Sequence, residues 1–366
     1  MRDVAEASCV SVSTVSRALS SPGMVADSTR VAVQAAAERL GYRRGRGMAR
    51  PTRHGRIGMV IPDLENPFFG AIGKAAQARA RAGGFSVYIA DTDDDPSLEG
   101  QVVASMTEQV DGVLMCWPRG ADAEIESLAQ TTPMVLVNRQ VPGVPSITFD
   151  NAGGLRYALD HLIALGHRAV AYAGGPAGSW ANQQRRLAFL AFGEDKPGLE
   201  LIELGNFPPY FSGGVLAGDL AVASGATAVI AFDDVMALGV LERLRQRGLR
   251  VPADMSVAGF DNTAVSEYVW PNLTTVDFPR ARIGRSSVEL LLSDPLTAPS
   301  IASGESSVLP GHLVVRQSTG PAPAAEAPDA PAGGTTSTKH VPYSTPTAGR
   351  KQRQQAGIRR RADKGS

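Results

Sequence analysis

From Ile57 onward, short apolar runs alternate with stretches of helical periodicity. Most of the runs are continuously apolar, which is the pattern of parallel strands that are buried on both faces. The predicted strands are 57–63, 85–91, 111–117, 133–139, 146–150, 168–175, 199–205, 227–234, 255–261 and 312–318. The predicted helices are 68–83, 97–109, 152–166, 181–192, 213–224 and 234–248. This βαβ series predicts one or two doubly wound sheets, and its length of about 260 residues favours two similar lobes.

Residues 3–42 show a different pattern, that of three short helices with a tight turn between the first two. Apolar residues at positions 4, 5, 10, 15 and 19 have the spacing that packs the first two helices together. Ser11 is placed to cap the second helix, which leaves Val12, Ser13, Ser16 and Arg17 on its outer face. This is the arrangement of a helix-turn-helix, and the alternative is a small amphipathic helical hairpin.

A recognition helix places its N-terminal residues against base edges in the major groove of double-stranded DNA. Arg17 is suited to contact a guanine or a phosphate. The hydroxyls of Ser13, Thr14 and Ser16 are suited to hydrogen bonds with phosphates or bases. The spacing therefore favours a DNA-binding headpiece over a purely structural hairpin.

Polar residues follow several of the predicted buried strands. They are Asn66, Asn138, Arg139, Asp150, Asp233 and Asp261. The carboxyl ends of parallel strands are where α/β proteins bind small ligands, and carboxylates and amides can bond pairs of sugar hydroxyls. Two alternatives stay open for single residues. An Asp after a buried strand is often a helix N-cap, and Phe149 or Phe207 alone is more often part of the core.

Two stretches fall outside both patterns. Residues 44–56 are basic, rich in Gly and interrupted by Pro51, so we expect a hinge or linker. Residues 319–349 are rich in Pro, Ala, Gly and Thr without an apolar period, so we expect a disordered tail that buries no core. The basic stretch at 350–361 continues this tail, and a solvated segment is its ordinary interpretation.

Charge is distributed unevenly along the chain. The 366 residues include 36 Lys and Arg against 36 Asp and Glu, which is a formal net charge of zero. Residues 1–56 carry ten Arg and four acidic residues, which gives +6, and residues 321–366 carry eight basic and three acidic residues, which gives +5. Residues 57–320 therefore carry −11. Basic ends of this kind are suited to polyanions, whereas the acidic body is not.

Composition excludes several classes of protein. The hydrophobic fraction is 43%, and no window of 18 consecutive apolar residues predicts a transmembrane helix. The N-terminus lacks the apolar stretch of a signal peptide, and Cys9 and Cys116 cannot make a disulfide framework. We therefore expect a cytoplasmic protein without membrane association. No cluster of metal ligands is visible, so we expect no metal and no cofactor.

Several segments together resemble the LacI/GalR family of transcriptional regulators. In the headpiece they are DVAEAS, VSVSTVSRAL and AAERLGY, and in the body they include IGMVIPDLENPFF, VLVNR, FDNAGG, HLIALGHRAVAYAGGP, VPADMSVAGFDN and PNLTTVDFP. The resemblance covers residues 2–318, and the combination of segments is very specific. It implies an N-terminal all-α helix-turn-helix headpiece, a two-lobed α/β periplasmic-binding-protein-like body with parallel sheets, and a homodimer.

The headpiece and hinge depart from the family at informative positions. The family's turn usually carries Gly where this chain has Cys9, and Cys is strained where Gly adopts positive φ. The family's hinge helix inserts a Leu into the minor groove, but here Ala49 and Arg50 precede Pro51 and Thr52. Pro51 also removes a helical N–H donor. We predict DNA contacts by Ser11, Val12, Ser13, Thr14, Ser16, Arg17, Arg30, Ala49 and Arg50.

The resemblance also implies which residues hold a sugar effector between the two lobes. They are Pro67, Phe68, Asn138, Phe149, Arg185, Phe207, Asp233 and Asp261. Asn138 stands where Asp is common in the family, and Asp233 stands where Asn is common. Both exchanges keep the capacity for hydrogen bonds and change the donor and acceptor roles, which alters the ligand that fits.

The predicted domains are a helix-turn-helix domain at 1–43, a hinge at 44–56, a two-lobed effector-binding and dimerisation domain at 57–318, and a tail at 319–366. We expect a transcriptional repressor that binds a palindromic operator as a homodimer and responds to a sugar or sugar-derived effector. One alternative is a sugar-binding protein without functional DNA binding, such as a receptor of the periplasmic type. The headpiece and the missing signal peptide oppose a receptor of that type.

A second alternative is an α/β enzyme. The chain has no Gly-x-Ser-x-Gly, no P-loop and no Gly-x-Gly-x-x-Gly. Its five His residues show no arrangement suited to a general base. Aspartates at strand ends leave this class formally open, but we expect a binding protein.

Overall fold

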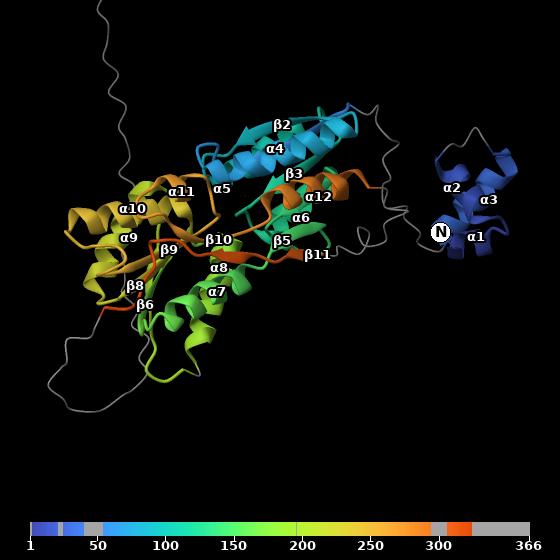
Figure 1. The fold of residues 1–366 in the computed structure, drawn as a ribbon. Helices are drawn as coiled ribbons and strands as arrows, with labels where there is room; N and C mark the ends of the chain where they lie inside the picture. The colour runs from blue at the N-terminus through green and yellow to red at the C-terminus, as the bar shows by residue number, and fades with distance from the viewer. Residues whose placement is uncertain (1, 21–24, 40–53, 195, 294–305, 324–366) are drawn as a thin grey trace, which may run out of the picture. The chain divides into compact units, whose positions relative to one another are not determined.

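The computed structural model describes residues 2–20, 25–39, 54–194, 196–293 and 306–323 (Figure 1). Ala49, Arg50 and most of the predicted tail lie outside these residues. The described residues form two compact units. The first unit takes them from Met1–Leu64, Phe69–Ile147 and Arg280–Ser306, and the second from Glu65–Phe68, Thr148–Pro279 and Ser307–Ser366.

The headpiece consists of three helices around a small apolar core. They are α1 (Arg2–Ala7), α2 (Val12–Ser20) and α3 (Asp27–Arg39). The core is built from Val and Ala side chains: Val4, Ala5, Val15, Ala18, Val33, Ala36 and Ala37, with Val10 and Val25 packed against them. The predicted packing at positions 4, 5, 10 and 15 is therefore confirmed. Small side chains allow the helices to approach closely over a core of few residues.

The first unit contains a six-stranded sheet in the order β11-β5-β4-β3-β1-β2. Its strands are β1 (Arg56–Ile61), β2 (Ser86–Asp91), β3 (Gly112–Cys116), β4 (Met134–Val137), β5 (Ser146–Phe149) and β11 (Ser306–Leu309). The pairings from β2 through β5 are parallel. The helices are α4 (Pro67–Ala82), α5 (Pro96–Met106), α6 (Asp122–Thr131) and α12 (Arg280–Leu292). Right-handed crossovers place α4 and α5 on opposite faces of this sheet.

The second unit repeats this plan in the order β12-β10-β9-β8-β6-β7. Its strands are β6 (Ala169–Gly174), β7 (Glu200–Asn206), β8 (Ala228–Ala231), β9 (Ser256–Phe260), β10 (Thr274–Asp277) and β12 (His312–Val314). Its helices are α7 (Asn151–Ala164), α8 (Trp180–Gly193), α9 (Phe211–Ala223), α10 (Asp234–Gln246) and α11 (Val265–Tyr268). The pairings from β7 through β10 are parallel, and β12 runs antiparallel to β10.

The sequence pattern predicted most of these elements, and the two-lobed parallel architecture is confirmed. Each predicted strand overlaps an observed strand. The strands β10 and β11 were not predicted. The helices α6, α11 and α12 were also missed. In α12 the apolar positions are interrupted by Gly284 and two Ser, which weakens its amphipathic pattern.

Helices α9 and α10 are in direct backbone contact through glycines. A Cβ at Gly214 would lie 1.9 Å from the carbonyl oxygen of Met236, and a Cβ at Gly239 would lie 2.1 Å from that of Phe211. No side chain fits at either distance, so glycine is required at both positions for this approach. The contact brings α10 close enough to cover the apolar face of β8 and β9.

A buried histidine, His167, connects several segments of the second unit by hydrogen bonds. His167 is fully buried and is hydrogen-bonded to Thr227 (2.9 Å), to Ser256 (3.0 Å) and to the carbonyl oxygen of Gly320 (3.1 Å). Burial lowers the pKa of His167, so the neutral ring is favoured. The N–H of Ala322 also donates to Leu165. The folded body therefore continues past residue 318, the predicted end of the body.

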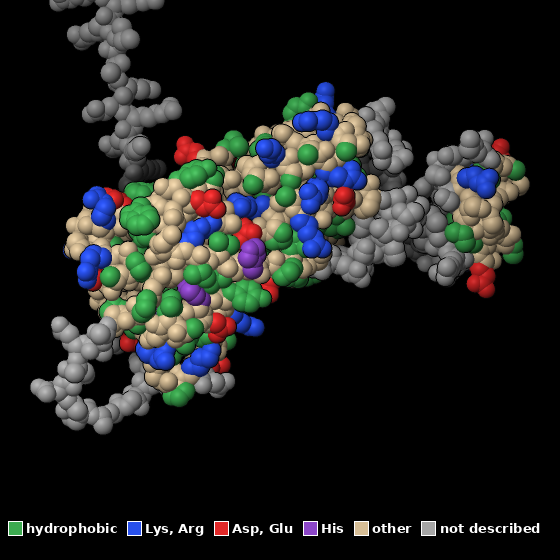
Figure 2. All heavy atoms as spheres, viewed as in Figure 1, with side chains coloured by type: hydrophobic (Ala, Val, Ile, Leu, Met, Phe, Trp, Pro, Cys, Tyr) green, Lys and Arg blue, Asp and Glu red, His purple; other side chains and the backbone are tan. Residues whose placement is uncertain are grey.

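The surface in view carries basic and acidic side chains interspersed over the described parts of both units (Figure 2). The net charge of −11 on residues 57–320 is therefore not gathered into one patch on that face.

No helix among the described residues is long and apolar enough to cross a membrane. Within the same residues, no group of three or more His, Cys, Asp or Glu is arranged to hold a metal ion.

Gly214→Ala should destabilise the second unit, because the new methyl group forces α9 and α10 apart. We expect a loss of about 1–3 kcal/mol or more in the free energy of unfolding. Gly100→Ala is the control, since a Cβ there meets nothing within 4 Å in helix α5. That control should gain up to about 1 kcal/mol from helix propensity. Urea unfolding followed by circular dichroism measures both, and equal stability of the two variants would contradict the close contact.

Candidate DNA-binding headpiece and effector site

The outer face of helix α2 is open to solvent. Ser11, Val12, Ser13 and Arg17 are exposed, and Thr14 is half-buried. Val12 leaves 43% of its surface exposed, so it does not belong to the headpiece core. Ser16 lies on the same helix. The exposed set agrees with the outer face predicted from the spacing, so these side chains are available to a partner.

Hydroxyl groups are arranged around the N-terminus of α2. The Ser11 Oγ accepts the Thr14 N–H at 3.1 Å, which confirms the predicted cap. It also shares hydrogen bonds with the hydroxyls of Ser13 (2.8 Å) and Thr14 (2.7 Å). One turn further, Arg17 Nε donates to the Ser13 carbonyl oxygen at 3.3 Å. The N-terminus of α2 therefore combines hydroxyl and N–H donors with the positive end of the helix dipole. Both features favour the binding of an anion.

Two neighbouring features modify the headpiece. Cys9, in the turn before α2, has φ of 53°, the left-handed region that favours glycine. The strain expected at this position therefore has a geometric basis. Arg30, at the start of α3, donates to the Asp27 carboxylate at 2.9 Å. This ion pair is largely exposed, so it costs little to exchange for a phosphate.

In the second unit, the Arg185 guanidinium is buried among aromatic rings and backbone. It lies 3.9 Å from the centroid of Phe260 and 5.1 Å from that of Phe232. It donates to Asn151 Oδ1 through Nε (3.2 Å) and a terminal nitrogen (3.0 Å), and to the Phe232 carbonyl oxygen (2.6 Å). Only 3% of Arg185 is exposed. A cation held in this way needs negative charge nearby.

Two aspartates supply that negative charge. Burial lowers the pKa of Arg185, and the carboxylates of Asp261 and Asp233 act in the opposite direction. Asp233 follows β8 and caps helix α10, since its Oδ1 accepts the Met236 N–H at 2.7 Å. Asp261 follows β9 at φ of 102°. The N-cap alternative is thus realised for Asp233.

Aromatic rings continue the cluster away from Arg185. Phe260 and Phe278 are stacked at 6.4 Å, and Phe278 stacks on Phe149 at 4.4 Å with an interplanar angle of 12°. Phe68 meets Phe149 edge-on at 6.3 Å. The cluster combines flat apolar surface with one cation and two carboxylates, which are the groups that bind a polyhydroxyl ring.

The predicted effector residues belong to both units. The structure brings together Phe68, Phe149, Arg185, Asp233 and Asp261 in the second unit. Asn138 belongs to the first unit, where it ends β4 at φ of 58°. Two predicted site residues, Asn138 and Asp261, thus adopt a backbone conformation that costs free energy, which is common at functional sites.

Two of the predicted residues have structural surroundings. Phe207 lies in the apolar core of the second unit, packed with residues such as Met236. The core interpretation that stayed open for Phe207 therefore has support. Pro67 is exposed and is the first residue of α4, a position that suits proline because its missing N–H has no helical partner there.

The sequence prediction missed the residues that hold Arg185. Asn151, Phe260 and Phe278 were not proposed as site residues, although each contacts the cluster. Asn151 and Phe260 stand beside residues that were proposed, so adjacency was a signal for both. Phe278 follows the unpredicted strand β10, and its one signal was its place in the segment PNLTTVDFP that resembles the family.

Comparison with known proteins places this chain in a family. Residues 1–45 match bacterial regulatory proteins of the lacI family, and residues 159–319 match the periplasmic binding protein-like domain. The HTH-type transcriptional regulator DegA of Bacillus subtilis (strain 168) is 31% identical, over 87% of this chain and 97% of DegA. The chain belongs to the LacI family of transcriptional regulators. The HTH-type transcriptional repressor CytR of Escherichia coli (strain K12) is 32% identical, over 87% of this chain and 96% of CytR.

Solved structures share the fold of this LacI-family protein. The transcriptional regulator CelR in complex with cellobiose matches with a TM-score of 0.63 and 29% identity, over 87% of this chain and 98% of CelR. A LacI family transcriptional regulator from Enterococcus faecium with bound ribose matches with a TM-score of 0.63 and 28% identity, over 73% of this chain and 99% of that chain. The resemblance inferred from the sequence motifs is therefore confirmed, and the chain is a DNA-binding transcriptional regulator.

Cys9→Gly should stabilise the headpiece, because glycine adopts positive φ without the steric cost that a Cβ brings. We expect a gain of about 1 kcal/mol in the local free energy of opening. Cys9→Ala is the matched control, since it keeps the Cβ and should give no gain. Hydrogen exchange of headpiece amides, followed by mass spectrometry on the full chain, measures the difference. Equal exchange in the two variants would show that the turn is unstrained.

Proposed function

We propose that this LacI-family regulator is a repressor that binds a roughly palindromic operator as a homodimer, under the control of a sugar or sugar-derived effector. One observation carries the proposal: a helix with an exposed polar face and a buried cluster of Arg185, Asp233 and Asp261 occur in the same chain. The first is suited to a DNA groove and the second to a polyhydroxyl ligand.

The headpiece, residues 1–43, contacts DNA through the outer face of α2. Its contact residues are Ser11, Val12, Ser13, Thr14, Ser16 and Arg17, with Arg30 on a phosphate and Ala49 and Arg50 in the hinge at 44–56. Arg17 reads a base edge or a phosphate, and the hydroxyls hold the backbone. The charge of +6 on residues 1–56 supplies the salt-dependent part of the affinity.

The effector binds to the body, residues 57–318, at the strand ends of the second unit together with Asn138. Arg185 makes hydrogen bonds with three of the five N–H donors of a guanidinium, so it has donors left for a hydroxyl oxygen. Asp233 and Asp261 accept hydrogen bonds from hydroxyl groups of the ligand. Phe68, Phe149, Phe207 and Pro67 provide apolar surface. Support comes from two relatives of known structure, which hold cellobiose and ribose.

A homodimer explains how one effector site can control two headpieces. A two-fold dimer presents two recognition helices to two half-sites, which is the symmetry of a palindrome. The edge strand β2 supports such an association, because it leaves 50% of Tyr88 and 38% of Ile89 exposed. Coupling between the sites is reciprocal: an effector that weakens operator binding is itself bound more weakly by the DNA complex.

Retention of a palindromic DNA fragment tests the whole proposal. The fragment comes from the region beside the protein's own gene, and the full-length protein is used at moderate salt. We expect retention that changes when a sugar from a panel including cellobiose and ribose is added. A protein that binds a sugar but retains no such fragment would be a sugar-binding protein without DNA binding, which is the alternative function.

Arg17→Ala should reduce the preference for the operator over scrambled DNA. A base contact by Arg contributes about 1–3 kcal/mol of discrimination, so we expect a loss of roughly 5- to 100-fold in the affinity ratio. Arg39→Ala is the control, because Arg39 is exposed at the end of α3 and should affect both DNAs alike. Competition binding measures the ratio. If the wild type does not distinguish the two DNAs, Arg17 has no base-reading role.

Asp261→Ala should abolish the response to the sugar without removing DNA retention. The reason is that Asp261 supplies a hydroxyl acceptor and part of the charge that balances Arg185. Asp160→Asn, an exposed aspartate of α7, is the control and should respond normally. Titration of the DNA complex with the sugar measures the response. An unchanged response in Asp261→Ala would exclude this residue from the site.

A further inference from the structure

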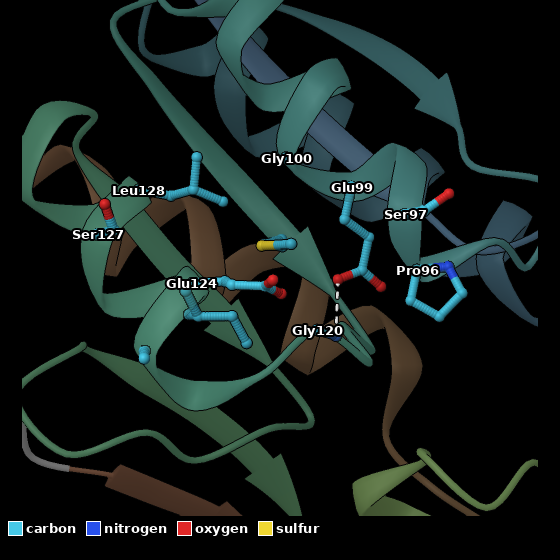
Figure 3. A pocket seen from close by; sticks show the side chains of 11 residues that line it. Pro96, Ser97, Glu99, Gly100, Gly120, Glu124, Ser127 and Leu128 are labelled. Carbon is cyan, nitrogen blue, oxygen red and sulfur yellow. Dashed lines mark hydrogen bonds between the residues drawn. The ribbon is translucent and has the colours of Figure 1, made fainter.

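Each unit fixes a loop at a strand end through an acidic residue in the first turn of a helix. In the first unit, Glu99 of α5 is 7% exposed and accepts the N–H groups of Arg119 (2.8 Å) and Gly120 (3.0 Å), beside a cavity of about 440 Å³ (Figure 3). Glu124 of α6 accepts the N–H of Ala121 at 3.2 Å. The Oε2 atoms of both carboxylates lie 3.1 and 3.3 Å from the position that a Cβ of Gly120 would occupy. The loop after β3 is therefore held by side chains of two helices.

The second unit repeats this arrangement at the loop after β9. Asp234 is the first residue of α10, the helix that leads into β9, and it is fully buried. Its Oδ2 accepts both the N–H (2.7 Å) and the hydroxyl (2.9 Å) of Thr263. Its Oδ1 accepts the hydroxyl of Thr275 in β10 at 2.6 Å. Hydrogen bonds to a charged acceptor are stronger than those between neutral groups, so these three bonds tie the loop firmly to α10 and β10.

The loop that Asp234 holds is the one that carries Asp261. Asp261 has φ of 102° and Asn262 has φ of 47°, so two consecutive residues with a Cβ adopt the left-handed region. This conformation costs free energy and persists only where the surroundings enforce it. The Asn262 N–H donates to the Thr275 hydroxyl at 3.2 Å, and that same hydroxyl donates to Asp234. Asp234 therefore binds both Thr263, which follows the strained pair, and Thr275, which accepts from it.

The two adjacent aspartates at the start of α10 make different contacts. Asp233 caps the helix by accepting the Met236 N–H, whereas Asp234 accepts donors from the loop and from β10. The charges of Asp233 and Asp261 both act to raise the pKa of Arg185. The start of α10 thus contributes one aspartate to the Arg185 cluster and ties down the loop that brings the other.

We propose that Asp234 is a positioning residue, which holds Asp261 in the conformation that contacts the effector and does not touch the effector itself; this rests on the proposed function, in which Asp261 accepts hydrogen bonds from a sugar. Without the bonds to Asp234, the loop relaxes towards negative φ and the Asp261 carboxylate leaves the cluster. A contact that is in place before the ligand arrives costs less entropy on binding, so this support raises the affinity for the sugar.

Thr275→Val in the full-length protein tests the support at nearly constant side-chain shape. It removes one hydrogen bond to Asp234 and the acceptor of the Asn262 N–H. Cellobiose and D-ribose are the probes, and we expect titration calorimetry to show binding about tenfold weaker than in the wild type. Without sugar, hydrogen exchange of the peptide that covers residues 261–264 should be about tenfold faster, because the loop opens more often.

Two further variants separate positioning from a general loss of stability. Thr274→Val is the matched control, since Thr274 is equally buried, lies on the opposite face of the same strand, and bonds Thr319 and the Arg316 N–H instead of Asp234. It should leave sugar affinity and loop exchange unchanged. Thr275→Ser keeps the hydroxyl and should restore both readouts, although it loses a buried methyl group. A purely structural effect would instead follow the thermal stability of each variant.

Two results would overturn the role of Asp234. One is equal sugar affinity and equal loop exchange in Thr275→Val and Thr274→Val, and the other is a Thr275→Ser variant that behaves as Thr275→Val does. If Thr275→Val does not fold, Thr263→Val gives the same test, because it removes the Thr263 hydroxyl and keeps its N–H.

Failure of the proposed function gives a different result. A wild type that binds neither sugar would contradict the effector site for these ligands. Loop exchange in the sugar-free protein then still decides whether Asp234 holds the loop, and exchange as slow in Thr275→Val as in the wild type would show that it does not.

Discussion

Burial of both faces of each parallel sheet constrains where this regulator can place polar chemistry. Strands such as β3, β4, β8 and β9 are buried along their whole length, so they carry almost only apolar side chains. Polar groups are then confined to the loops and helix starts that follow the strands. The Arg185 cluster of the second unit and the Glu99 carboxylate of the first are both found there.

The two units solve the problem of a buried charge in opposite ways. In the second unit, the Arg185 cation is balanced by Asp233 and Asp261 and covered by aromatic rings, which leaves hydrogen-bonding groups with little net charge. In the first unit, burial raises the pKa of Glu99, and the N–H groups of Arg119 and Gly120 together with the charges of Arg119 and Arg139 act in the opposite direction. The arrangement around Arg185 suits a neutral polyhydroxyl ligand, because its hydrogen-bonding groups carry little net charge.

Among the described residues of the headpiece, the core has neither large side chains nor a sheet to stabilise it. Its core is made of Val and Ala, and its tight turn places Cys9 at positive φ. Its helices are therefore held together by a small free energy, and changes in the turn affect DNA contacts through the position of α2. The +6 charge of residues 1–56 adds attraction to phosphate without adding stability to this core.

The sequence by itself determined the periodic elements, the exposed face of α2, and the family, because each depends on local spacing or on contiguous motifs. It also located Asp233 and Asp261, since an acidic residue directly after a buried strand is visible without a structure. Tertiary structure alone decided that Phe278 and Asn151 complete the Arg185 cluster, and that Glu99 and Glu124 converge on Gly120. These residues come from separate strands and helices, and their distances are set by how the sheet brings distant segments side by side, which no local pattern records.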